Sequence, residues 1–208
     1  MDQSDIEALF TRESGEYVFA RWGRPIVPVV FGVEEETLRV VKGAVEAVCI
    51  LAGHRMAETD PEFGVNFMWF FLREWDELLG VPDLDRLVPE LDGLVGRLQA
   101  VDANQYRIFR FDEAGAIKAC FVFLRMDENL QAVSADTLAL SQTVQSFLLW
   151  SDVAFREHSP LAVAGGATVL RPDVADVIRA AYDPVMPVAA RDASHALRLA
   201  ARVGTDVQ

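Results

Sequence analysis

The sequence predicts an α+β domain with a mixed or antiparallel central sheet, flanking helices and a helical C-terminal third. β-Branched and aromatic runs alternate with helical segments in the first half, and helical periodicity dominates after Ser134. No repeat, low-complexity tract or Ser/Pro-rich linker divides the 208 residues. We therefore expect a single domain over 1–208, with residues 1–16 and 204–208 as loose termini.

Two strands are expected near the N-terminus. Tyr17–Trp22 and Ile26–Phe31 are rich in aromatic and β-branched residues, and Gly23-Arg24-Pro25 forms a turn between them. Pro28 has no N–H to donate, which favours an edge position or a bulge for the second strand.

The next segments alternate between helix and strand. Glu34–Ala52 repeats apolar residues at helical spacing and is followed by Gly53, which suits a left-handed helix end. Gly64–Leu72 is expected as a buried strand. Leu84–Leu98 is expected as a helix in which Pro89 marks either the true first turn or a kink.

The clearest hairpin joins Tyr106–Phe111 to Ile117–Met126 through Asp112-Glu113-Ala114-Gly115. The second strand is apolar on both faces, so it should be a central strand covered on both sides. Three helices are expected after this hairpin. The first has Ser134 as its N-cap, the second begins at Pro172, and the third covers about residues 191–202. Gly165-Gly166 reads as a flexible turn rather than a phosphate-binding loop.

The formal charge of −13 argues against a nucleic-acid partner, because phosphate binding requires clustered positive charge. Ten acidic residues against two arginines lie between Glu58 and Asp92, whereas residues 153–208 are neutral overall. Glu58, Asp60 and Glu62 could serve a hard cation or acid–base chemistry. A solvated acidic flank explains them more simply.

Common catalytic motifs are missing. The chain has no GxSxG, SxxK, GxGxxG or GK[ST] sequence, and its two cysteines, Cys49 and Cys120, lie on apolar faces as expected for inert core residues. The three histidines do not form HExxH. A site built from His54 or His158 with acidic residues is one alternative, and a structural role for each histidine is the other.

Trp75 and Trp150 flank polar residues and are candidates for a groove or a dimer contact, although burial in the core is the simpler expectation. The acidic start, Met1–Glu7, is unlike a signal peptide, and the longest apolar runs, such as Phe67–Leu72, are too short to span a bilayer. We therefore expect a cytoplasmic protein with no membrane partner.

The C-terminal half resembles an uncharacterised bacterial domain family, usually secreted or lipoprotein-like, with a zincin-like (metallopeptidase-type) fold that lacks the zinc-binding motif. Its Glu-Glu-x-x-Gln helix corresponds here to the run from Ser141 to Gln145, followed by Leu149 and Ser151-Asp152. The helix ending in Tyr182-Asp183-Pro184 fits the same scheme. Upstream, Arg21-Trp22, Pro25 and Asn66 also fit, so that the resemblance covers about residues 17–197.

The resemblance implies a zincin-like domain whose catalytic helix is chemically disarmed. Ser141 and Gln142 stand where the family has glutamates, so only Gln145 and Asp152 carry over directly. None of these residues supplies the imidazoles that bind zinc or the carboxylate that activates water. An exposed helix edge with a polar end is the plainer interpretation of the same residues.

We therefore predict a non-catalytic binding or interaction domain, without cofactor or metal. Its groove for an unknown protein or small ligand would involve Asn66, Gln142, Gln145, Asp152 and Tyr182. One alternative is the metal-assisted hydrolase with His54 or His158. Another alternative is a structural subunit of a homo-oligomer. Both the binding domain and the structural subunit could form a homodimer.

Overall fold

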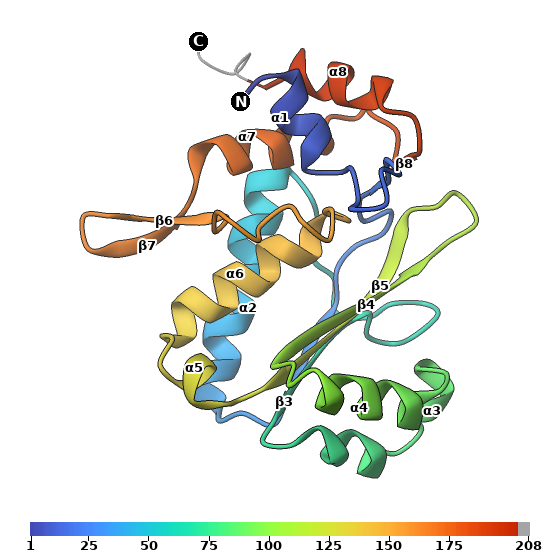
Figure 1. The fold of residues 1–208 in the computed structure, drawn as a ribbon, viewed down its shortest axis with the longest axis vertical. Helices are drawn as coiled ribbons and strands as arrows, with labels where there is room; N and C mark the ends of the chain where they lie inside the picture. The colour runs from blue at the N-terminus through green and yellow to red at the C-terminus, as the bar shows by residue number, and fades with distance from the viewer. Residues whose placement is uncertain (204–208) are drawn as a thin grey trace.

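A four-stranded mixed sheet organises the computed structural model, which describes residues 1–203 (Figure 1). The strand order is β2-β3-β5-β4: β2, β3 and β5 are parallel, and β4 runs antiparallel to β5. The strands are β2 (Pro28–Phe31), β3 (Phe67–Leu72), β4 (Gln105–Phe111) and β5 (Ile117–Arg125). Helices flank the sheet, which confirms the predicted α+β class with a mixed sheet.

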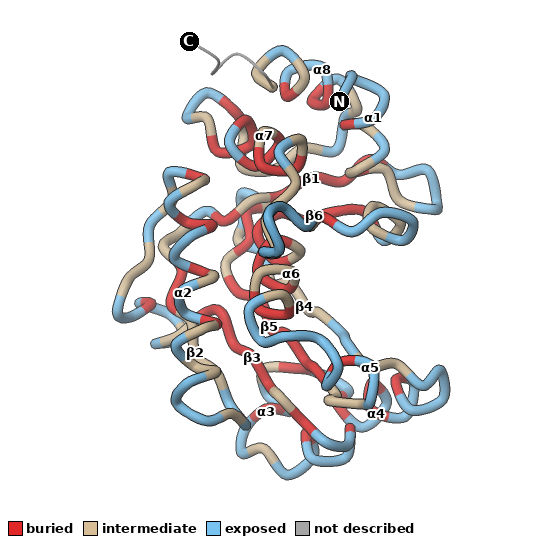
Figure 2. The backbone as a smooth tube through the Cα atoms, turned by 90° about the vertical axis from the view of Figure 1, so that its left-hand side faces the viewer, coloured by how far each residue is buried: buried red, intermediate tan, exposed pale blue. Residues whose placement is uncertain are grey.

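Apolar side chains on the two faces of the sheet pack against two separate layers of helices. Trp69 and Val122 point into a core shared with α2 and α6, whereas Phe70 and Phe123 point into a second core under η1, α3 and α4. Figure 2 shows β3 and β5 as buried through most of their length. The helical elements are α2 (Glu35–Ala52), η1 (Trp75–Gly80), α3 (Leu84–Leu87), α4 (Leu91–Ala100) and α6 (Ala135–Phe147). The predicted two-sided cover of β5 is confirmed.

Local sequence signals explain where several elements begin and end. Gly53 closes α2 with a left-handed φ of 61°, and the Ser134 side chain accepts a hydrogen bond from Thr137 N to cap α6. Pro28 lies in β2 at one edge of the sheet, as predicted. Pro89 interrupts the helix expected over Leu84–Leu98, which the structure divides into α3 and α4.

The C-terminal third contains a hairpin in addition to helices. β6 (Leu161–Ala164) and β7 (Ala167–Leu170) pair around Gly165-Gly166, both at positive φ, and project away from the body in Figure 1. The expected turn is present, but the two strands beside it were not predicted. The remaining elements are α5 (Glu128–Gln131), α7 (Pro172–Ala181), β8 (Ala189–Ala190) and α8 (Ser194–Ala200).

The N-terminal segment differs from the loose terminus that the sequence suggested. It forms α1 (Gln3–Ala8), which lies beside α8 in Figure 1, and Ile6 and Phe10 are completely buried in the first core. β1 (Phe19–Ala20) then pairs with β8. Residues 204–208 lie outside the described residues.

None of the helices in the described part of the chain combines the length and the apolar character needed to cross a bilayer.

Candidate ligand-binding site

A pocket of about 470 Å³ lies between β4, the C-terminal half of α6 and the segment that follows this helix. The strand supplies its floor and the segment 149–156 supplies one wall. Its lining residues are Arg12, Gln105, Tyr106, Arg107, Phe109, Gln145, Leu149, Trp150, Ser151, Asp152, Phe155 and Arg156. The lining therefore carries three arginines and one carboxylate, although the whole chain has a net charge of −13.

Arg107 occupies the centre of this arrangement. Its Nη2 donates to Gln142 Oε1 at 2.8 Å and to Gln145 Oε1 at 3.0 Å, while its Nε is buried without a hydrogen-bond partner in the described part of the chain. No carboxylate among residues 1–203 forms an ion pair with it. The guanidinium is thus held by neutral amide oxygens near the C-terminal end of α6, where the helix dipole favours a cation.

Burial lowers the pKa of the Arg107 guanidinium, because charge in a poorly solvated site is disfavoured. An arginine remains protonated even so. Amide oxygens satisfy part of its hydrogen-bonding capacity but leave its positive charge without a counter-charge. A carboxylate entering the pocket would supply the charge and accept hydrogen bonds in the planar geometry that guanidinium groups favour.

The other charged residues that line the pocket are Arg12, near the N-terminus, and Asp152 and Arg156, in the wall formed by residues 149–156. Arg156 forms two hydrogen bonds with the carboxylate of Glu13, at 3.1 and 3.3 Å. Asp152 accepts from Glu13 N at 3.1 Å and from Ser151 Oγ at 3.3 Å. The hydrogen bond from Glu13 N is the main reason why the pKa of Asp152 lies below its ordinary value. This carboxylate therefore stays ionised at neutral pH, and its hydrogen bonds hold it at the wall of the pocket.

Three of the five predicted groove residues meet at this pocket. Gln145 and Asp152 line it, and Gln142 binds Arg107 from behind while its Nε2 donates to Gln105 Oε1 at 2.7 Å. Gln142 is buried rather than on an exposed helix edge. The spacing of the two glutamines places both amides on the side of α6 that faces β4.

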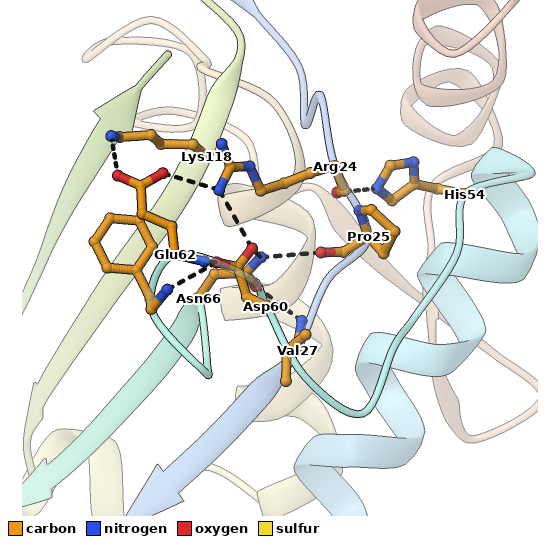
Figure 3. A network of polar contacts seen from close by, with 9 residues as sticks. Arg24, Pro25, Val27, His54, Asp60, Glu62, Asn66 and Lys118 are labelled. Carbon is orange, nitrogen blue, oxygen red and sulfur yellow. Dashed lines mark hydrogen bonds and ion pairs between the residues drawn. The ribbon is translucent and has the colours of Figure 1, made fainter.

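Asn66 lies elsewhere, in the polar network of Figure 3. It accepts from Val27 N at 2.8 Å and donates to Pro25 O at 2.9 Å and to Asp60 Oδ2 at 3.0 Å. The side chain is completely buried and joins the entry of β2 to the loop before β3. The structure therefore does not bring Asn66 to the pocket. The hydrogen bonds of its side chain instead connect two segments of backbone.

Asp60 and Glu62 of the acidic stretch belong to the same network. Burial raises the pKa of Asp60, but hydrogen bonds from Phe63 N and Glu62 N, with further donors, lower it more, so that the net shift is downward. Glu62 pairs with Lys118 at 2.6 Å and with Arg24 at 3.1 Å (Figure 3). These carboxylates are thus engaged by backbone amides and cations.

Tyr182 also lies away from the pocket. Its hydroxyl accepts from Trp22 N at 3.3 Å and donates to Phe147 O at 2.9 Å inside the first core. Desolvation raises the pKa of this phenol far above its ordinary value. Tyr182 thus ties the end of α7 to the end of α6.

The histidines proposed for the hydrolase alternative make no ligand cluster with acidic residues. His54 Nε2 lies 2.9 Å from Arg24 O, on the other side of that residue from Asp60 in Figure 3, and His158 is exposed in a loop. Residues 1–203 contain no group of three or more His, Cys, Asp or Glu side chains arranged to hold a metal ion. Cys49 and Cys120 are buried, and burial raises the pKa of each thiol to about 12.

The sequence interpretation missed Arg107 and Arg12. One signal was present in the strand Gln105–Phe111. Arg107 and Phe109 are two positions apart, so their side chains share one face of this strand, and Phe109 packs against the first core. A charged residue at an inward-facing strand position requires a partner. The missing information was which helix covers that face, and whether a carboxylate stands opposite.

Trp150 is the only one of the two candidate tryptophans that reaches this pocket. It is buried, stacks on Phe10 with ring centroids 5.3 Å apart, and donates from Nε1 to Val144 O at 2.8 Å. Trp75 lies in the second core, on the other side of the sheet.

In comparisons with protein-family models, with curated proteins and with solved structures, nothing matches this chain.

Proposed function

We propose that this protein is a non-catalytic binding domain whose ligand presents a carboxylate to Arg107 in the pocket between β4 and α6. The observation that carries the proposal is the half-buried Arg107 guanidinium, which is bound by two glutamine amides and paired with no carboxylate of residues 1–203. Arg12 at the rim adds positive charge. An incoming carboxylate would replace water at this cation and gain charge-assisted hydrogen bonds.

The proposal retains the zincin-like relationship as an expectation about α6. In that scheme, Gln142 and Gln145 stand on the helix that carries the zinc ligands in active enzymes. Here their amide oxygens are directed at Arg107 instead, at 2.8 and 3.0 Å. Such a helix supports binding rather than hydrolysis, because amides neither bind zinc well nor activate water.

The tryptophan indoles provide a direct test of the proposal. Glutarate is titrated into ¹⁵N-labelled protein and the indole N–H signals are followed. Trp150 lines the pocket, so its signal should shift, whereas Trp75, which donates to Ala103 O in the second core, should not move. Phosphate and propylamine serve as comparison ligands of other charge and shape.

Two variants complete the test. Arg107→Gln removes the cation and should abolish the shift of Trp150. Arg97→Gln, an exposed arginine on α4 beyond the opposite face of the sheet, should leave it unchanged. A folded protein whose Trp150 signal ignores glutarate, or responds equally with Gln at position 107, would contradict the proposal.

A further inference from the structure

On the premise that Arg107 binds a ligand carboxylate, as the proposed function states, we propose that this carboxylate belongs to an acidic side chain of an extended peptide. The peptide adds to the sheet as a fifth strand along β4. The pocket at Arg107 is one part of a longer groove on the free edge of this strand.

β4 is the terminal strand on its side of the sheet, and no strand within residues 1–203 pairs with its outer edge. Arg125 N donates to Asn104 O at 2.8 Å, which sets the phase of the antiparallel ladder. In that phase the backbone groups of Tyr106 and Ile108 point toward β5, and those of Gln105, Arg107 and Phe109 point outward. These outward groups are the donors and acceptors that an added strand requires.

Hollows extend along the strand on both sides of Arg107. One of about 460 Å³ shares Gln105 and Gln145 with the central pocket, and another of about 460 Å³ shares Arg12, Phe109 and Leu149 with it. The three hollows therefore adjoin one another beside the seven residues of β4. A strand of this length extends over roughly 20 Å, much more than a single small acid would occupy.

The chemistry of the groove favours an acidic partner of alternating pattern. The cations Arg107 and Arg12 line the groove on one face of β4, whereas the apolar side chain of Ile108 lies on the opposite face, against the second core. A peptide with acidic residues on one face and β-branched residues on the other matches both the alternation of a strand and the local charge.

A second copy of this chain is a poorer occupant of the same edge. β4 has two arginines, Arg107 and Arg110, and no carboxylate. Pairing β4 with β4 would bring cations together without supplying an anion, which destabilises cross-strand pairs. An inward-directed charge on an edge strand is also a recognised device against self-pairing.

The experiment uses the full chain and the peptide acetyl-Val-Glu-Val-Glu-Val-Glu-Val-amide, with a lysine-for-glutamate peptide and glutarate as comparison ligands. The acidic peptide should bind at least tenfold more tightly than glutarate, and the lysine peptide should not shift Trp150. Two further peptides carry N-methyl groups on all glutamates or on all valines. Because only alternate N–H groups of an added strand face β4, one methylated peptide should retain its affinity and the other should lose at least tenfold.

A matched pair of protein variants tests the edge itself. Gln105→Pro and Gln105→Ala both remove the side chain, but only proline removes the outward N–H. The proline variant should bind the acidic peptide at least fivefold more weakly than the alanine variant. Because both variants lack the same pocket side chain, their affinities for glutarate should equal each other. Circular dichroism and thermal unfolding establish that both variants are folded.

The outcomes separate the two proposals. If glutarate shifts Trp150 but the peptide binds no more tightly, or both methylated peptides bind like the parent, strand addition is wrong and the carboxylate site stands. If neither glutarate nor the peptide shifts Trp150, both proposals are wrong. Formation of a dimer through β4, abolished by Gln105→Pro, would assign the edge to a second copy and overturn the peptide proposal.

Discussion

Arg107 is positioned by shape as well as by charge. Its Nη2 reaches two amide oxygens at 2.8 and 3.0 Å, and its Nε is enclosed between β4 and α6. A planar fork of donors can keep these contacts while its remaining N–H groups receive a carboxylate. An ammonium group has the same charge but cannot make this set of contacts from one plane.

We therefore expect Arg107→Lys to weaken glutarate binding about tenfold, which corresponds to about 1.4 kcal/mol. The measurement is the dissociation constant from the Trp150 indole titration. Arg97→Lys on the exposed side of α4 is the control and should bind as the original protein does. Equal affinity for the Arg107→Lys variant would show that charge alone recognises the ligand.

His195 makes stability depend on pH. Its Nδ1 lies 2.8 Å from the Tyr17 hydroxyl, and its Nε2 is buried without a hydrogen-bond partner among residues 1–203. Burial lowers its pKa from 6.5 to about 4, with a smaller effect of Arg198. The unfolded chain binds a proton as the pH falls below 6.5, whereas the folded chain resists protonation until about pH 4. The contribution of neutral His195 to stability is therefore fully present above about pH 6.5 and is lost as the pH falls toward about 4.

The free energy of unfolding should fall by about 2 kcal/mol between pH 7 and pH 5. His54, whose pKa is lowered mainly by burial, adds to the change in the same direction. Urea denaturation at the two pH values measures it. The double variant Tyr17→Phe/His195→Phe should lose most of the pH dependence, and His158→Gln, at an exposed loop position, should retain it. A pH-independent free energy for the original protein would contradict the assignment.

At the scale of elements, the turn after β2 depends on a single glycine. Gly32 has φ of 82°, and a Cβ added there would lie 2.2 Å from Phe71 O. Both the conformation and the close approach of β3 exclude a side chain. This turn directs the chain from β2 into α2, so it also determines how the helix is placed over the sheet.

Gly32→Ala should destabilise the protein by about 3 kcal/mol or more. Gly43→Ala is the matched control, because Gly43 is an exposed residue of α2, and beyond its own helix backbone and chain neighbours no atom of residues 1–203 lies within 4 Å of an added Cβ. That substitution should stabilise by about 0.5–1 kcal/mol through improved helix propensity. The two unfolding free energies, from urea denaturation, should change in opposite directions, and a shared direction would contradict the explanation.

At the scale of the whole molecule, the N-terminal segment completes the first core. Phe10 is fully buried, stacks on Trp150 and contacts Phe19 edge-on, with centroids 5.3 and 5.1 Å apart. Backbone hydrogen bonds from Ser151 N to Leu9 O and from Val18 N to Phe10 O attach this segment to the wall of the pocket and to the residue that precedes β1. The segment thus supports Trp150 and, through it, the candidate site.

Phe10→Ala should lower the free energy of unfolding by about 3–5 kcal/mol, the range for truncation of a buried aromatic residue. Ile50→Ala, at a residue 74% exposed on α2, should change it by less than about 0.5 kcal/mol. Thermal and urea unfolding provide the comparison. A small effect at Phe10 would mean that residues 1–16 contribute little to the core, as the sequence first suggested.

Much of the secondary structure followed from local signals. Gly53 and Ser134 marked the correct helix ends, and the apolar faces of Ile117–Met126 predicted a strand covered on both sides. These signals are local because backbone conformation and capping depend on residues a few positions apart. The short strands β6 and β7 and the helix α1 were missed, since their segments have weak periodicity and obtain their order from packing.

The candidate site depended on contacts that sequence spacing does not contain. Spacing along the chain marked Gln142, Gln145 and Asp152 as a polar group near the end of one helix, and the alternation of strands and helices predicted the fold class. The packing of β4 against α6 placed Arg107, 35 residues from Gln142, against those amides, with no carboxylate of residues 1–203 paired to it. The reason is that a guanidinium needs partners to be buried, while the identity of those partners is decided by which strand and helix pack together.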